Sequence, residues 1–125
     1  MKEKLKKQIK SFAYAANGIK LGLRERHLKI HFFFTFIVIL ASFLLNISFL
    51  EWIIILLFIA LVISAEIFNT ALETICNLLK DELKLDFEAT HAARDLSAAA
   101  VFILAIAAAL VGLLIFLPKL INLLI

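Results

Sequence analysis

The sequence contains very few residues that break helices or cross-link chains. Its 125 residues include three glycines, one proline and one cysteine, Cys76. Because turn residues are so scarce, the chain is expected to form long helices. A single cysteine excludes an intramolecular disulfide and a cysteine-based metal cluster, and Cys76 is expected to be a small buried residue on a packed helix.

Several kinds of catalytic or binding site are also missing. There is no GxxxxGK[ST] loop, and the glycines are too dispersed to cradle phosphates in a glycine-rich turn. His27 and His31 share one face of a helix, but with His91 they do not form a set spaced for zinc. No Ser/His/Asp arrangement is recognisable. The first two histidines are therefore expected near lipid headgroups and the third in a loop.

Apolar residues dominate the chain. They make up 64% of it, with a mean hydropathy of +1.05, which is more than a soluble domain of this size could bury. The length allows one domain over residues 1–125, with three apolar runs long enough to cross a bilayer. The predicted spans are residues 31–50, 52–79 and 96–117, with a charged loop over 80–95, and Pro118 and Lys119 marking the end of the third span.

Basic residues are concentrated at the start of the chain. The net charge is +3, and nine of the thirteen lysines and arginines lie between Lys2 and Lys29. Apolar residues at helical spacing predict an amphipathic helix over 3–28 that lies on the membrane surface, the alternative being a soluble helix that packs on a partner. Residues 2–29 and the 80–95 loop together hold twelve of the thirteen basic residues, which predicts a cytoplasmic N-terminus and loop and a C-terminus outside.

Polar residues in the second span form a stripe along one face. In Ala65–Asn77, reading AEIFNTALETICN, five polar side chains fall within roughly 100° of the helix surface: Glu66, Asn69, Thr70, Glu73 and Asn77. Ionisable residues inside a membrane helix are costly and indicate a functional site. The stripe is therefore predicted to be a working polar site rather than helix-packing contacts.

Depth separates the two carboxylates of this stripe. At 1.5 Å per residue from Trp52, Glu66 lies about 21 Å and Glu73 about 32 Å into the layer. Glu73 is expected at the cytoplasmic interface, where it can meet a divalent cation and a phosphate. Glu66 lies among acyl chains, where a carboxylate can accept a proton from a hydroxyl group. A magnesium set is available in Glu73 and Glu25, with cations at Lys20 and Arg94.

Four segments resemble the small bacterial diacylglycerol kinase and undecaprenol kinase family. They read SFAYAANGIK at 11–20, RERHLKIH at 24–31, SAEIFNTALE at 64–73 and ARDLSAAAV at 93–101. The resemblance implies an integral-membrane lipid kinase of the bacterial inner membrane, with a surface helix and three spans, assembled as a homotrimer with sites shared between protomers. It implies transfer of the γ-phosphate of Mg-ATP to the hydroxyl of diacylglycerol or undecaprenol.

The resemblance also implies a role for individual residues. Glu66 matches the catalytic base, Asn69 the asparagine that supports it, and Glu25 and Glu73 the carboxylates that bind Mg²⁺. The nucleotide is expected to contact a further set of side chains: Tyr14, Lys20, Glu25, Glu73, Asn77, Arg94 and Asp95. Arg94 stands where the family usually has lysine, and Asn77 where aspartate is common.

Two non-enzymatic readings compete with the kinase. One is a transporter or channel subunit with the polar stripe along an ion or proton path, and the other is an oligomeric scaffold held by interhelical polar contacts. The outer half of the second span, residues 53–63, is wholly apolar. No path continues outward from the stripe, so a one-sided site is favoured.

Overall fold

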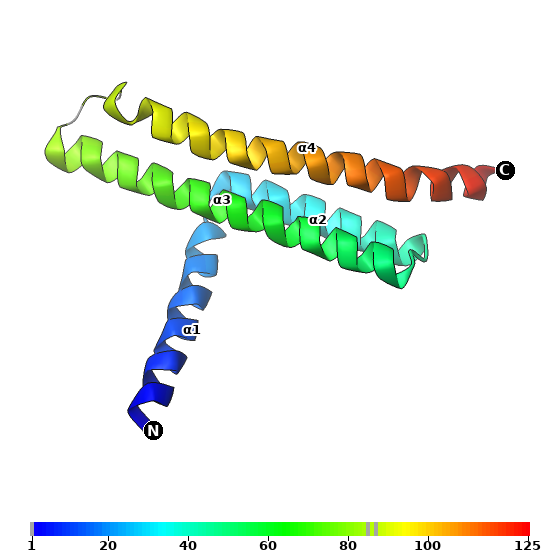
Figure 1. The fold of residues 1–125 in the computed structure, drawn as a ribbon, viewed down its shortest axis with the longest axis horizontal. Coiled ribbons are helices and arrows are strands. Elements are labelled where there is room, and N and C mark those ends of the chain that lie inside the picture. The colour runs from blue at the N-terminus through cyan, green and yellow to red at the C-terminus, as the bar shows by residue number, and fades with distance from the viewer. Residues whose placement is uncertain (1, 85, 87) are drawn as a thin grey trace.

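Four helices account for nearly all of the chain in the computed structural model, which describes residues 2–84, 86 and 88–125. They are α1 (Lys2–Gly22), α2 (Arg26–Leu44), α3 (Phe49–Leu83) and α4 (Glu88–Leu124). In Figure 1, α2, α3 and α4 run side by side and α1 projects from them at a steep angle. Since α3 contacts each of the other helices, it is the element on which the fold is built.

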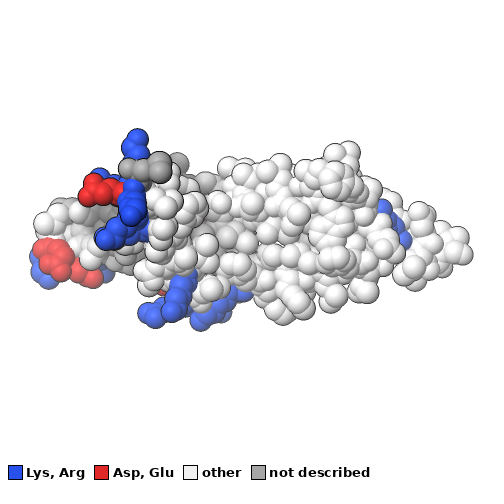
Figure 2. Space-filling view, turned by 90° about the horizontal axis from the view of Figure 1, so that it is seen from below, with Lys and Arg blue, Asp and Glu red and all other residues white. Residues whose placement is uncertain are grey.

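Three of the helices, α2, α3 and α4, are long and apolar enough to cross a membrane. Only a few apolar side chains are buried, and large ones remain exposed along all three helices. In the view of Figure 2, charged side chains gather at one end of the molecule and the long middle section carries none. An apolar middle section suits contact with lipid. The predicted all-α integral-membrane fold is confirmed.

The junction between α1 and α2 corrects the predicted N-terminal helix. Instead of continuing to residue 28, α1 ends at Gly22, and the chain turns before α2 begins at Arg26. Leu28 is fully buried, and a Cβ atom on Gly22 would lie 2.7 Å from its Cδ2 atom. The turn therefore forms where glycine lets the buried leucine side chain pack against the backbone.

The turn between α2 and α3 comes earlier than the predicted break at Glu51 and Trp52. Ser48 caps α3: its backbone N–H donates to Glu51 Oε2 at 2.6 Å, and the Glu51 N–H donates to Ser48 Oγ at 3.3 Å. This reciprocal pair satisfies two backbone donors at the start of the helix. Lys119 Nζ of α4 lies 3.1 Å from Glu51 Oε2, which ties α4 to the same end of the bundle.

The charged segment 80–95 is mostly helical, which corrects the predicted loop. Helix α3 extends to Leu83 and ends where Lys84 takes a left-handed conformation, with φ of 53°. Helix α4 begins at Glu88. Residues 85 and 87 of the predicted loop lie outside the described residues. A charged helix can form in water as well as a loop can, so leaving the membrane does not end α3.

Pro118 does not end the last helix either. Helix α4 continues through it to Leu124. Proline removes one backbone hydrogen bond, and membrane helices tolerate this loss where neighbouring groups compensate. The side chain that follows, Lys119, is held by its ion pair with Glu51. The third apolar helix is therefore longer than the predicted span of residues 96–117.

Candidate active site

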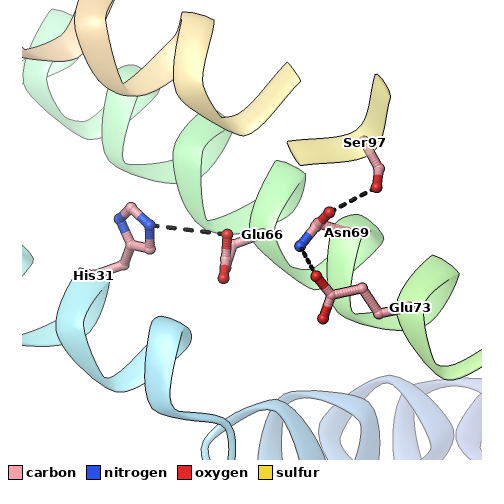
Figure 3. Close-up of polar contacts among 5 residues, drawn as sticks. All are labelled: His31, Glu66, Asn69, Glu73 and Ser97. Carbon is pink, nitrogen blue, oxygen red and sulfur yellow. Dashed lines mark hydrogen bonds and ion pairs between the residues drawn. The ribbon is translucent and has the colours of Figure 1, made fainter. Parts of the chain in front are cut away.

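The polar stripe of α3 is most buried at Glu66 and Asn69, which face the neighbouring helices, and is exposed at Asn77. Glu66 and Asn69 are buried, with 4% and 8% of their surface exposed, and Glu73 is half-buried. Figure 3 shows Glu66 on the side toward α2, and Asn69 and Glu73 one and two turns further along α3. A carboxylate buried among apolar helices is costly unless it is partnered, so its retention indicates a function.

A short hydrogen-bond chain crosses from α4 to this stripe. The Ser97 hydroxyl lies 2.6 Å from Asn69 Oδ1, to which it can donate, and 2.9 Å from the Arg94 carbonyl of its own helix. Asn69 Nδ2 in turn donates to Glu73 Oε1 at 3.1 Å. Because the carbonyl of Asn69 faces α4, its amide N–H is directed at Glu73. The three side chains therefore form one unit (Figure 3).

Glu66 faces a different helix. His31 of α2 places its Nε2 atom 3.9 Å from Glu66 Oε2. His31 also lines an apolar groove of about 700 Å³. Three helices contribute to the walls of this groove, among them Val38 of α2, Val62 of α3 and Gly112 of α4. The groove thus runs along the apolar middle of the molecule and includes His31, the side chain that faces the buried carboxylate of Glu66.

Another polar contact between α3 and α4 lies beyond Glu73. Arg94 Nη2 donates to Asn77 Oδ1 at 3.0 Å, and Arg94 Nε donates to the buried Thr90 at 3.4 Å. Arg94 and Asn77, two positions at which the sequence analysis expects a departure from the family, therefore contact each other. Asp95 Oδ2 lies 3.0 Å from His91 Nδ1, one turn back along α4.

The structure does not bring every predicted site residue to the stripe. Tyr14 and Lys20 are exposed on α1, and Glu25 is exposed in the turn that precedes α2. The side chains of these three residues form no hydrogen bond or ion pair with the described residues. Glu25 takes the N-cap position of α2 but makes no side-chain capping bond. Its carboxylate is therefore left available to a ligand or to another chain.

Three residues that the sequence analysis did not assign to the site contact its members. They are His31, which was expected among headgroups, and Ser97 and Thr90, to which no role was assigned. The spacing of Ser97 and Thr90 within one helical face of α4 was visible in the sequence. No local pattern could show which residues of α3 that face meets.

The donor set suits a magnesium ion that is shared with a substrate. Carboxylate oxygens are what this cation prefers, and it is commonly bound through one or two of them together with substrate phosphates. The described residues contain no group of three or more acidic, histidine or cysteine side chains that could enclose a metal ion. Glu73 and Glu25 carry carboxylate oxygens of the kind that such an ion takes.

The fold and the site define a small integral membrane protein with a one-sided polar site buried between its helices. Within this class, the family profile of prokaryotic diacylglycerol kinase matches residues 13–116. The chain belongs to this family, and the predicted enzyme class, a lipid kinase, is confirmed.

Two relatives extend over most of the chain. An undecaprenol kinase of Bacillus subtilis (strain 168) is 37% identical over 120 residues, which cover 95% of both chains. A diacylglycerol kinase of Synechocystis sp. is 34% identical over 116 residues, which cover 92% of this chain and 65% of that relative. No solved structure matches the chain. Family membership favours the kinase over the ion-path and scaffold alternatives.

Proposed function

We propose that this protein phosphorylates the hydroxyl group of a membrane lipid alcohol, taking the γ-phosphate directly from ATP at the cytoplasmic face of the inner membrane. The observation that carries the proposal is the position of Glu66, a buried carboxylate that faces His31, which lines an apolar groove. Water-soluble substrates have no reason to enter such a groove. A lipid whose chain lies in it would present its headgroup end beside Glu66.

Glu66 is proposed as the general base. It would accept the proton of the lipid hydroxyl while the hydroxyl oxygen bonds to the γ-phosphorus and ADP leaves with the electron pair of the broken bond. Proton transfer to a positioned side chain contributes roughly 10²–10⁴-fold in rate. Burial serves this role because bulk water cannot compete with the lipid for the carboxylate.

Asn69 and Glu73 are proposed to organise the phosphate side of the site. Glu73 Oε1 accepts from Asn69 Nδ2, which leaves Glu73 Oε2 for a metal ligand role. Glu73 and Glu25 would hold Mg²⁺, which supplies positive charge to the ATP phosphates. Phosphoryl transfer depends mainly on positioning and charge neutralisation, so a few carboxylates and cations suffice.

The nucleotide is proposed to bind where α3 and α4 extend beyond the apolar layer. Arg94 lies there, already fixed by Asn77 and Thr90, with Asp95 one residue further along α4. The side chains of Tyr14, Lys20 and Glu25 form no hydrogen bond or ion pair with this site within the described chain, and a homotrimer in which a neighbouring chain supplies them would complete it. In this arrangement the N-terminus and the segment around Lys84 face the cytoplasm and the C-terminus faces outward.

The acceptor lipid is proposed to be undecaprenol or diacylglycerol. The relative that matches over 95% of its own length is named for undecaprenol, so this alcohol is the first to test. The full-length protein would be purified in detergent and supplied with Mg-ATP and undecaprenol, diacylglycerol or no lipid. The proposal requires ADP release that depends on one of the lipids, together with a phosphorylated lipid seen by mass spectrometry. ADP release without a lipid product would contradict it.

The Glu66→Gln variant tests the proposed base. It keeps the size and hydrogen-bonding capacity of the side chain, so we expect normal membrane insertion and an unchanged elution volume on size-exclusion chromatography. Turnover should fall by about 10²-fold or more because the amide cannot take up the hydroxyl proton. The matched control is Glu82→Gln, the same change at an exposed position of α3, which should keep wild-type turnover. A Glu66→Gln variant with substantial turnover would exclude the assigned base.

A further inference from the structure

Glu66 has a single titratable partner in the described part of the chain. This partner is His31, whose Nε2 atom lies 3.9 Å from Glu66 Oε2. No described charged group of α4 lies within ion-pairing distance of either side chain, and the charged or titratable neighbours of His31 on its own helix are His27 and Lys29. Among the described residues, His31 is therefore the titratable side chain to which Glu66 can pass a proton.

The two side chains differ in their access to the surroundings. Only 5% of the Glu66 side chain is exposed, against 24% of the His31 side chain. His31 lies near the start of α2, close to the turn that holds Glu25, and so at the polar end of the molecule. It joins the buried carboxylate to the membrane surface, where a proton can be released to water.

The distance between His31 Nε2 and Glu66 Oε2 fits a pair of side chains that can pass a proton without being permanently hydrogen-bonded. At 3.9 Å the two atoms are beyond the 2.7–3.2 Å typical of a direct bond. One bridging water or a rotation of either side chain closes such a gap. A loosely coupled pair leaves the carboxylate free to accept the lipid's proton first.

We propose that His31 is the proton acceptor that returns Glu66 to its carboxylate form after each turnover. This inference rests on the proposed function of Glu66 as the base. In the chemical step, the proton of the lipid hydroxyl moves to Glu66 and the phosphoryl group moves to the hydroxyl oxygen. The proton then leaves Glu66 for Nε2 of neutral His31, which becomes an imidazolium ion and releases it to water. His31 acts through Glu66 and is a positioning residue rather than a catalytic one.

Three substitutions separate this role from packing and from charge balance. His31→Gln keeps an N–H donor but cannot carry the proton, His31→Arg keeps a positive charge near Glu66, and His31→Ala leaves space for a small molecule. All three should lower kcat by about tenfold or more, the scale of a lost proton-transfer group. The KM value for ATP should stay within about twofold, because the proposed nucleotide site at Arg94 does not include His31.

Chemical rescue supplies the readout that a structural role would not move. Imidazole added to His31→Ala should restore turnover in proportion to the concentration of its neutral form. It should not restore turnover in Glu66→Gln, where there is no proton to collect. His27→Gln, an exposed histidine one turn earlier on α2, serves as the matched control and should match the wild type.

Each result decides the point. Full turnover in His31→Gln, full turnover in His31→Arg, or a folded His31→Ala variant that imidazole does not restore would overturn the inference. Should His31→Ala fail to fold, the kcat of His31→Gln and His31→Arg still decides it. A wild-type protein that phosphorylates no lipid would instead overturn the proposed function and this inference together, whereas an active wild type with an active His31→Gln refutes the inference alone.

Discussion

Replacing Ser97 by alanine tests whether the contact between α4 and α3 is part of the active site. In the structure this hydroxyl lies 2.6 Å from Asn69 Oδ1, and Asn69 Nδ2 donates to Glu73 at 3.1 Å. Without the Ser97 hydroxyl, no described side chain of α4 donates a hydrogen bond to the Asn69 carbonyl, so the orientation of the Asn69 amide group is no longer fixed. The side chain can then turn over, and its carbonyl would face the Glu73 carboxylate.

The expected loss follows from the energy of one such bond. A hydrogen bond between uncharged groups contributes about 0.5–1.5 kcal/mol net, and about 1.36 kcal/mol of activation free energy is a factor of ten in rate. Ser97→Ala should therefore lower kcat about two- to thirteenfold by these scales. Ser97→Thr keeps the hydroxyl and should retain most of the turnover.

The assay is lipid-dependent ADP release measured for Ser97→Ala, Asn69→Ala and the double variant. If the serine acts through the asparagine, the double variant is no slower than Asn69→Ala alone, because the second change removes a contact that no longer exists. Ser64→Ala, an exposed serine on α3, is the control and should be neutral. Effects of Ser97→Ala and Asn69→Ala that multiply fully in the double variant would refute the reasoning.

Two further changes probe the metal site and the fold. Glu73→Gln removes a proposed Mg²⁺ ligand and should raise the Mg²⁺ concentration for half-maximal turnover about tenfold or more; an unchanged magnesium titration would remove Glu73 from the metal site. Gly22→Val should lower the melting temperature, because even a Cβ atom there would lie 2.7 Å from the buried Leu28 side chain. Gly18→Ala should raise it, since a Cβ at Gly18 meets nothing within 4 Å and alanine in a helix gains about 0.8–1 kcal/mol over glycine. A circular-dichroism melt in detergent checks both, and equal shifts of one sign would contradict the packing argument.

The helical period was enough to predict the face of α3 that carries the site. The helix is regular through residues 66–77, so the spacing of Glu66, Asn69 and Glu73 places them on the buried side whatever the partner helices are. The number of long apolar helices followed from composition in the same way. Each of these features depends on the residues of a single continuous segment, so it can be predicted from the sequence.

Features that depend on two segments could not be read from the chain. The contact of Ser97 with Asn69 joins residues 28 positions apart, and that of Arg94 with Asn77 joins residues 17 apart. Helix ends were missed for a related reason: the charges at 80–95 indicate water, but water does not forbid a helix. The end of α1 depends on how Leu28 packs against Gly22, which is also a tertiary contact.

Shared sites can be tested by combining two inactive chains. The Glu25 side chain forms no hydrogen bond or ion pair with a described residue, although Glu25, Glu66 and Glu73 are all proposed to act on one substrate pair. If a neighbouring chain supplies Glu25, a protein with Glu25→Gln and a protein with Glu66→Gln can complement each other. At equal expression and random assembly, about one site in four draws both intact carboxylates from different chains. The mixture should then show roughly a quarter of wild-type turnover if each single variant is inactive.

An active site built from a single chain cannot produce such complementation. A site built entirely from one protomer would carry either the Glu25 change or the Glu66 change, so every site in the mixture would be defective. The control is the two variants purified separately and mixed in detergent only at the assay, where no exchange of subunits occurs and no turnover should appear. Co-expressed chains with no more turnover than this control would place Glu25 in the same protomer as Glu66, or outside the site, and the proposed sharing would be wrong.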